Sequence, residues 1–438
     1  MGDRQEISAW SMYSWANHGW ETTVSTVLIG PWLLALATKH RAGSSTLFSV
    51  IGLHLKAESF PSFVVTLAAL AQLVVLPSLG AASDRLADRR RWLSGACVAG
   101  SAVAVLLAAT SGGQYVVAGG LFIIGSLAYG GSNVLYNAYL PEIASPKERD
   151  SVSSRGFAYG YVGGGLLLAA NLALLLAHHD IGLSKSTAVR ICFVSAGAWW
   201  SVFGLLSLRR LRGQRRPADS SAPAASRRWS TRDTFRLVWR MPQTRRYLLA
   251  YLLFSDAISA VIGLSSTFIT HELFGNSASR AATFLFALIL LIQFVAMAGA
   301  MAFARLAARF GTKRVLLGSL VIWCLVILYT YAALRSKAQA VVVGIVIGIV
   351  LGGSQALARS LWSQLIPPSR EAAFFGIFEV ANEGTAWIAP LLFTVVVNAT
   401  GSYHQAILSL LILFVTGGGV LALTDLDAAR TEQQGLAT

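Results

Sequence analysis

The chain has 438 residues, of which 55% are hydrophobic and only 13% are charged, whereas soluble globular proteins carry about 25% charged residues. Long apolar runs recur from end to end, and each can cross the ~30 Å hydrocarbon core of a bilayer. This composition excludes an ordinary soluble domain and predicts a protein that crosses the membrane many times.

Twelve apolar segments of helical length follow one another along the chain. They cover residues 10–37, 59–82, 92–111, 115–140, 152–177, 188–208, 246–272, 281–304, 314–334, 338–362, 371–398 and 404–424. The alternating segments of a membrane β-barrel are absent from the sequence, so we expect an all-α membrane protein with about twelve transmembrane helices. The first segment is too long for the core of a signal peptide and is expected to remain as a helix.

The distribution of charge predicts the orientation. The formal net charge is +15, which could indicate a nucleic-acid partner. With both termini on one side, however, 27 of the 35 Lys and Arg residues fall on that side. The positive-inside rule then places both termini in the cytoplasm of a cell-membrane protein, and no nucleic acid is expected. The basic residues would instead face anionic lipid.

The sequence divides into two halves that repeat each other. Residues 209–233 are rich in Arg, Pro, Ser and Ala and lack apolar periodicity, which is typical of a linker. We therefore predict an N-terminal six-helix bundle over 1–208, a basic cytoplasmic linker over 209–243 and a C-terminal six-helix bundle over 244–438.

Two pairs of matching stretches support the repeat. GGSNVLYNAYLPEIASP at 130 matches GGSQALARSLWSQLIPP at 352, and RLADRRRWL at 85 matches RLAARFGTKRVLL at 305. The offsets are 222 and 220 residues, so one six-helix repeat explains both. Since six is even, the halves must be parallel repeats related by an axis along the membrane normal.

The loop after the second apolar segment carries a family resemblance. GAASDRLADRRR, residues 80–91, resembles the Gly-x-x-x-Asp-Arg-x-Gly-Arg-Arg signature of the major facilitator superfamily. Ala87 replaces the later glycine and Asp88 takes an arginine position, so the basic pair falls one residue on. The resemblance implies a secondary transporter with a gate formed by Gly80, Asp84, Arg85, Arg89 and Arg90.

Three further stretches are similar to one branch of that superfamily, which includes fungal vacuolar autophagy-related amino-acid effluxers and bacterial relatives. They are WSMYSWANHGWETTV (10–24), NAYLPEIASPKERDSVSSRGFAYGYVGG (137–164) and LGGSQALARSLWSQLIPPSREAAFFGIFEV (351–380). The chain departs from the branch at Ser14, where an Asp is usual, and at His18 and Glu21, where small residues are usual. The resemblance implies an amino-acid-like substrate.

Ionisable residues inside the first apolar segment are candidates for proton coupling. Glu21 lies about mid-bilayer, and an ionised carboxylate there costs at least ~2.5 kcal/mol. Asn17 and His18 are four and three residues earlier, so all three share one helical face. This group could exchange protons or bind substrate; alternatively, Glu21 pairs with a cation between helices and His18 is a packing residue.

Candidates in the second half mirror these positions. The repeat places Asp256 opposite His18 across the pseudo-twofold axis and adds it to the proton-coupling set. Glu379 and Glu383 are four residues apart with Asn382 between them, so one carboxyl should be protonated or a cation should lie near. Arg359 is that candidate cation; it could bind a substrate carboxylate or anchor the helix near the cytoplasm. We assign Glu383 to the proton-coupling set and Glu379 and Asn382, like Asn17, to the substrate site.

Neutral side chains complete the predicted substrate site. We expect Asn133, Tyr136, Asn137, Gln355 and Trp387 to contact substrate, although amides also join helices and aromatic residues also pack. Cys97, Cys192 and Cys324 lack metal-ligand spacing, and GxxxxGK[ST], HExxH and GxSxG are absent from the sequence. The chain is therefore not expected to be an enzyme or to carry a metal or cofactor.

The sequence thus favours a monomeric, proton-coupled exporter of an amino-acid-like or amphipathic solute, with protons and membrane lipids as further partners. Two alternatives stay open: a multidrug or lipid exporter, and a non-transporting receptor or scaffold on the same fold.

Overall fold

The computed structural model describes residues 3–40, 48–50, 53–86, 88–211, 230–275, 277–383 and 388–435. Within these ranges, eleven helices are long and apolar enough to cross a membrane, and a shorter apolar helix lies at Ile388–Thr400. This agrees with the predicted all-α fold class.

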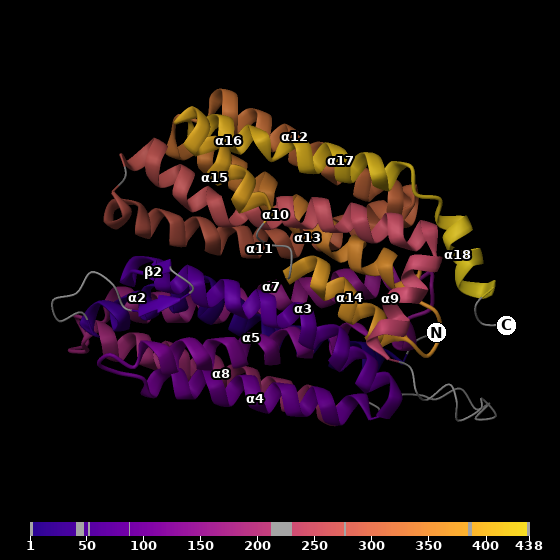
Figure 1. Cartoon of the computed structure of the whole chain (residues 1–438), viewed down its shortest axis with the longest axis horizontal. Coiled ribbons are helices and arrows are strands. Elements are labelled where there is room, and N and C mark those ends of the chain that lie inside the picture. The colour runs from indigo at the N-terminus through magenta and orange to yellow at the C-terminus, as the bar shows by residue number, and fades with distance from the viewer. Residues whose placement is uncertain are drawn as a thin grey trace.

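The helices form two bundles that lie one above the other in Figure 1. The first bundle contains α1 (Arg4–Gly19), η1 (Trp20–Leu28), α2 (Ile29–His40), α3 (Phe60–Leu86), α4 (Arg89–Ala109), α5 (Tyr115–Asn137), α6 (Leu140–Ile143), α7 (Arg149–Ala177) and α8 (Lys185–Arg210). The second contains α10 (Pro242–Phe274), α11 (Ala278–Phe310), α12 (Thr312–Ala333), α13 (Lys337–Ser363), α14 (Glu371–Glu383), α15 (Ile388–Thr400), α16 (Tyr403–Ser409) and α17 (Leu411–Ala422). Both termini lie at one end of the helices, which we call the terminal face; the other end is the far face.

Each bundle has its own buried apolar core. One core cluster contains residues of the first bundle only, including Trp10, Trp20 and Trp200. The other is built mainly from the second bundle around Trp323 and Trp362. The bundles meet where α3 packs on α14 and where α7 packs on α11 and α13.

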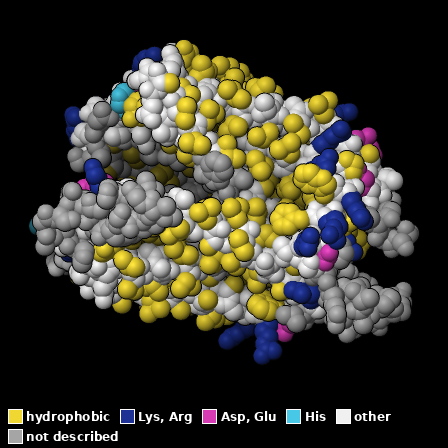
Figure 2. Space-filling model, in the orientation of Figure 1, with side chains coloured by type: hydrophobic (Ala, Val, Ile, Leu, Met, Phe, Trp, Pro, Cys, Tyr) yellow, Lys and Arg dark blue, Asp and Glu magenta, His cyan; other side chains and the backbone are white. Residues whose placement is uncertain are grey.

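The outer surface is apolar, as expected for a protein in lipid. Val74 of α3 is 70% exposed and Val321 of α12 is 59% exposed. Figure 2 shows hydrophobic side chains spread over the middle of the molecule, with Lys and Arg gathered at the terminal end. Such a band between charged ends matches a hydrocarbon layer.

A π-helical segment within the first crossing affects the site. The first membrane crossing changes to π-helix at η1, which begins directly after Gly19. π segments usually mark functional positions, because they change which side chains face the interior. The eleventh crossing is built from α14 and α15, with the described residues interrupted at 384–387.

Five short elements were not predicted. In the outer loop, whose structure the sequence left open, β1 (Phe48–Val50) pairs with β2 (Leu53–Leu55) as an antiparallel hairpin, followed by η2 (Ala57–Ser59). Near the terminal face, α9 (Thr231–Arg240) forms within the predicted linker, and α18 (Leu426–Gly435) follows the last crossing.

Candidate functional site

A cavity of about 610 Å³ lies between the two bundles. Its lining runs from Asn137 and Arg359 outward to Pro31, Thr270 and Leu334, which lie toward the far face. Figure 2 shows the surface hollowed between the bundles at the end opposite the termini. The cavity is therefore reached from the far face.

The first bundle supplies a polar wall. Asn17, His18 and Glu21 all line the cavity, as does Asn133 of α5. The Asn17 side-chain amide donates to Asn133 Oδ1 at 2.8 Å. His18 Nδ1 lies 3.1 Å from the Ser14 carbonyl oxygen and 3.3 Å from Asn17 Oδ1. The structure thus brings together the three residues that the sequence placed on one helical face.

Glu21 is held by a residue that the sequence did not single out. The Tyr129 hydroxyl of α5 donates to Glu21 Oε2. Glu21 remains exposed to the cavity rather than to lipid headgroups. Glu21 is the second residue of η1. The Thr26 hydroxyl, five residues later, donates to the Glu21 carbonyl oxygen at 2.8 Å. The wider π turn turns this carboxylate into the cavity.

Arg359 lies at the inner end of the cavity and is buried. Its guanidinium donates to Asn137 Oδ1 at 3.0 Å, to Ser153 Oγ at 3.0 Å and to the Ser153 carbonyl oxygen at 2.7 Å. It also lies 4.1 Å from the ring centre of Phe157 and 5.0 Å from that of Trp10. Arg359 is therefore a cavity residue held by the first bundle.

Acidic and amide groups surround this arginine. The Asn137 amide donates to Glu379 Oε1 at 2.7 Å. Tyr251 donates to Asn382 Oδ1 at 3.1 Å, and Tyr161 donates to Gln355. Glu379, Asn382, Gln355 and Tyr136 are all in the cavity lining. The predicted substrate residues of α5, α13 and α14 thus converge on one place.

The second bundle supplies an apolar wall toward the far face. This wall contains Val261, Phe268, Ile269, Leu285, Phe286, Leu288, Ile289, Ile292, Val326, Ile327, Val343, Ile347 and Leu351. The cavity therefore has one polar side and one largely apolar side.

Three predicted residues have a different position or cannot be placed. Asp256 is buried outside the cavity lining, and its Oδ2 accepts the Ala389 backbone N–H at 2.7 Å. It lies at the start of α15, where a carboxylate favours the helix N-terminus. The Glu383 side chain and Trp387 fall outside the described residues.

At the terminal end of the cavity, two of the predicted gate residues lie where α3 meets α14. The Asp84 carboxylate of α3 accepts backbone N–H groups of Ala372 at 3.1 Å and Ala373 at 2.8 Å, at the start of α14. A Cβ built on Gly80 would come within 2.2 Å of the Ala372 carbonyl oxygen. Only glycine permits this approach of α3 to α14.

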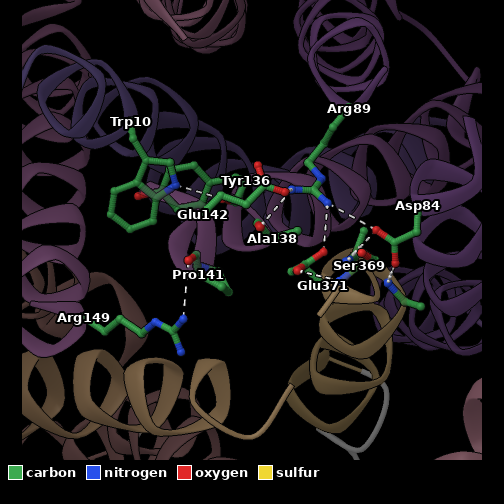
Figure 3. A network of polar contacts seen from close by, with 12 residues as sticks. Trp10, Asp84, Arg89, Tyr136, Ala138, Pro141, Glu142, Arg149, Ser369 and Glu371 are labelled. Carbon is green, nitrogen blue, oxygen red and sulfur yellow. Dashed lines mark hydrogen bonds and ion pairs between the residues drawn. The ribbon is translucent and has the colours of Figure 1, made fainter. Parts of the chain in front are cut away.

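Arg89 is the centre of the gate (Figure 3). It is fully buried, and its guanidinium lies 3.2 Å from Asp84 and 3.6 Å from Glu371. It also binds Glu142 and donates to the Ala138 carbonyl oxygen at 2.9 Å. Arg89 is the first arginine of the signature's basic pair, which falls one residue later in this chain than in the superfamily signature. Glu142 and Glu371 were missed, because an acidic residue at the end of a predicted apolar segment gave no sign of its partner.

The other two predicted gate residues make no described contact between bundles. Arg85 is exposed and donates to the Ala81 carbonyl oxygen of its own helix at 3.2 Å. Arg90 is partly buried beside the start of α4. The gating role of all five residues stays a prediction.

A second set of contacts crosses the bundles near the gate. Asp150 at the start of α7 accepts hydrogen bonds from Thr312 and Ser360, both at 2.6 Å. Arg149 donates to the Ser363 carbonyl oxygen at 2.8 Å. These residues lie in the stretch PKERDS, whose charges gave no signal beyond an exposed loop.

Comparison with known proteins identifies the family. The profile described as "Vacuole effluxer Atg22 like" matches residues 2–434. The chain belongs to the Atg22-like family. The Bacillus subtilis MFS-type transporter YxiO is 26% identical over 95% of this chain and 94% of its own length. Autophagy-related protein 22-1 of Phaeosphaeria nodorum is 24% identical, over 91% of this chain and 81% of its own.

Solved structures support the fold of this Atg22-like chain. The human organic anion transporter MFSD10 superposes with a TM-score of 0.68 at 15% identity, covering 95% of this chain and 99% of that one. FucP in the outward conformation gives a TM-score of 0.71 at 13% identity, covering 96% and 98%. The Atg22-like chain is a multi-pass major facilitator transporter, as its sequence motifs implied.

Proposed function

We propose that this Atg22-like transporter exports an amino-acid-like solute across the cell membrane in exchange for protons, with both termini in the cytoplasm. The observation that carries the proposal is the carboxylate of Glu21, which lines a cavity between the bundles that is closed at the terminal face. A carboxylate at this depth is unfavourable in a sealed apolar interior. It is tolerated where water or cargo reaches it during a transport cycle.

The proton step follows from how the surroundings of Glu21 change as the bundles rock. With the far face open, the carboxylate faces the cavity and accepts a hydrogen bond from Tyr129. When that side closes, water leaves and an ionised carboxylate becomes costly. Uptake of a proton removes the charge, so the closed form is reached at a lower free energy. His18, three residues away, is the second proton carrier we propose.

The substrate class follows from the two walls. Arg359 offers a planar donor fork to a carboxylate, in place of Asn137 and Ser153, which now accept its hydrogen bonds. Glu379 lies beside it and suits an ammonium group. The apolar wall of the second bundle suits an aliphatic or aromatic side chain. An amino acid with an apolar side chain combines all three features.

The apolar wall also supports a second candidate, a multidrug or lipid exporter. Such a substrate would use the far part of the cavity and would not need Arg359. The two candidates therefore differ in their dependence on a carboxylate.

A solute panel in proteoliposomes separates the candidates. Proteoliposomes that contain the purified chain are loaded with a labelled apolar amino acid. Release of the label is then measured after addition of the same amino acid, its methyl ester, its decarboxylated amine or a lipophilic cation to the outside. We expect exchange with the free amino acid only. Exchange with the lipophilic cation, but not with the amino acid, would replace the proposal with the multidrug reading.

A further inference from the structure

Helix α9 has three distinct faces. Thr234, Leu237, Val238 and Met241 are buried against the protein, where α9 packs on α3, α10 and α14. Phe235 is 47% exposed and Trp239 is 72% exposed, and they form a second stripe four residues apart. Arg232, Arg236 and Arg240 form a third, exposed stripe, and each arginine follows a residue of the Thr231–Phe235–Trp239 line by one position. The buried face accounts for why α9 packs on the protein, but it does not account for the aromatic stripe or the arginine stripe.

The apolar stripe of α9 starts at the edge of the lipid-facing surface. Thr231 Oγ1 lies 3.5 Å from Ser78 Oγ on α3. Val74, one turn before Ser78, is 70% exposed and so faces lipid. Phe235 and Trp239 follow Thr231 by one and two turns along the same face of α9. Both aromatic side chains are thus placed where the hydrocarbon layer ends, the depth that Trp prefers.

The charge of α9 and the residues after it is strongly positive. Residues 231–246 contain five arginines and one acidic residue, Asp233. Asp233 is engaged by the helix cap, where its carboxylate accepts hydrogen bonds from the Ser230 hydroxyl at 2.6 Å and from the Ser230 N–H at 3.0 Å. These bonds hold the pKa of Asp233 below its usual range. Asp233 also lies 3.8 Å from the Arg236 guanidinium, but it is one acid among five arginines in residues 231–246. The segment therefore keeps a net positive charge next to two exposed aromatic rings.

We infer that α9 is an interfacial helix that binds anionic lipid headgroups through Arg232, Arg236 and Arg240 while Phe235 and Trp239 enter the acyl boundary. An amphipathic helix with arginines beside aromatic residues has the composition that lies in a membrane surface. Each basic residue near an anionic surface increases binding by about fivefold. The inference is independent of the substrate and of proton coupling.

Depth measurements on the full chain test this inference. A nitroxide is attached at position 239 through Trp239→Cys, and in a second sample at 235 through Phe235→Cys. Cys324 is replaced by Ala, because Cys97 and Cys192 are buried. The accessibility of each label to oxygen and to a water-soluble nickel chelate is compared in phosphatidylcholine vesicles with and without phosphatidylglycerol.

We expect the oxygen-to-nickel ratio to rise about fivefold or more when phosphatidylglycerol is present. The triple variant Arg232→Gln, Arg236→Gln, Arg240→Gln should lose this rise. The matched control Arg91→Gln, Arg209→Gln, Arg210→Gln removes the same charge from exposed residues elsewhere on the terminal face and should keep it. Labels that stay in water with phosphatidylglycerol, or an equal loss in both triple variants, would overturn the inference.

Discussion

Asn137 and Arg359 occupy equivalent positions of the two repeats, 222 residues apart, and the structure joins them by a 3.0 Å hydrogen bond. Two equivalent residues can touch only where the pseudo-twofold axis passes between them. The inner end of the cavity therefore lies on the axis about which the bundles are arranged. A position on this axis belongs to both bundles equally, which suits a residue that holds cargo between them.

Replacing Arg359 by Lys should reduce substrate affinity by about tenfold or more, because each hydrogen bond to a charged group is worth about 1.5–3 kcal/mol. Lysine keeps the charge but lacks the fork. The measurement is the concentration dependence of amino-acid exchange in proteoliposomes. Arg190→Lys is the control, since Arg190 donates to the Ala108 and Thr110 carbonyl oxygens, each at 2.9 Å, outside the cavity lining. Equal affinity in both variants would make Arg359 a purely structural residue.

Replacing Asp84 by Asn should open the terminal face. Asn still accepts a hydrogen bond from the start of α14 but loses the charge that favours a helix N-terminus and pairs with Arg89. We expect the closed state to lose about 1–2 kcal/mol, a fivefold to thirtyfold shift. Nitroxides at Arg91 and Arg314, exposed residues of opposite bundles, report the distance between them. Asp180→Asn makes the same chemical change at an exposed position beyond the other end of α7 and should leave that distance distribution unchanged.

Gly80→Ala should open the same end for a steric reason. The added Cβ would meet the Ala372 carbonyl oxygen at 2.2 Å, so α3 and α14 cannot approach as closely. Gly95→Ala on α4 is the matched control, because nothing lies within 4 Å of its Cβ position. Both changes raise helix propensity by up to about 1 kcal/mol. If both variants give the wild-type distance between labels 91 and 314, close packing at Gly80 does not govern the gate.

Asp150→Ala should weaken the closure of the terminal face through contacts that do not involve the signature stretch 80–91. It removes the acceptor for Thr312 and Ser360, a loss of about 3–6 kcal/mol when both bonds to the carboxylate are counted. The label pair 91 and 314 should separate, as in the Asp84 variant. Asp180→Ala, an exposed acid beyond the other end of α7, should have no effect. A null result for Asp150 would limit the gate to the α3–α14 contact.

The sequence predicted which residues lie deep in the membrane better than which way they point. Apolar segment lengths fix depth, so Asn17, His18 and Glu21 could be placed together. Rotation about the helix axis is not fixed by depth. The repeat therefore paired Asp256 with His18, whereas the structure directs Asp256 to the start of α15. No periodicity in the sequence indicated this contact between α10 and α15.

Contacts between distant helices were also beyond sequence reasoning. The repeat made Asn137 and Arg359 equivalent but could not show that they touch, because it does not locate the axis. Tyr129 and Asp150 were missed for a similar reason. A tyrosine or an acidic residue is common at helix ends and interiors, and only the partner, Glu21 or Ser360, reveals its role.

The central claim is that Glu21 carries the coupled proton, and proton flux with Glu21→Gln tests it most directly. Wild type and variant are reconstituted in pH-clamped liposomes, and solute exchange and solute-driven proton movement are recorded together. Because Glu21 is exposed to the cavity, the variant should fold and exchange solute. We predict that wild type moves protons with the solute while Glu21→Gln exchanges solute without moving protons. Undiminished proton movement in Glu21→Gln would contradict the claim.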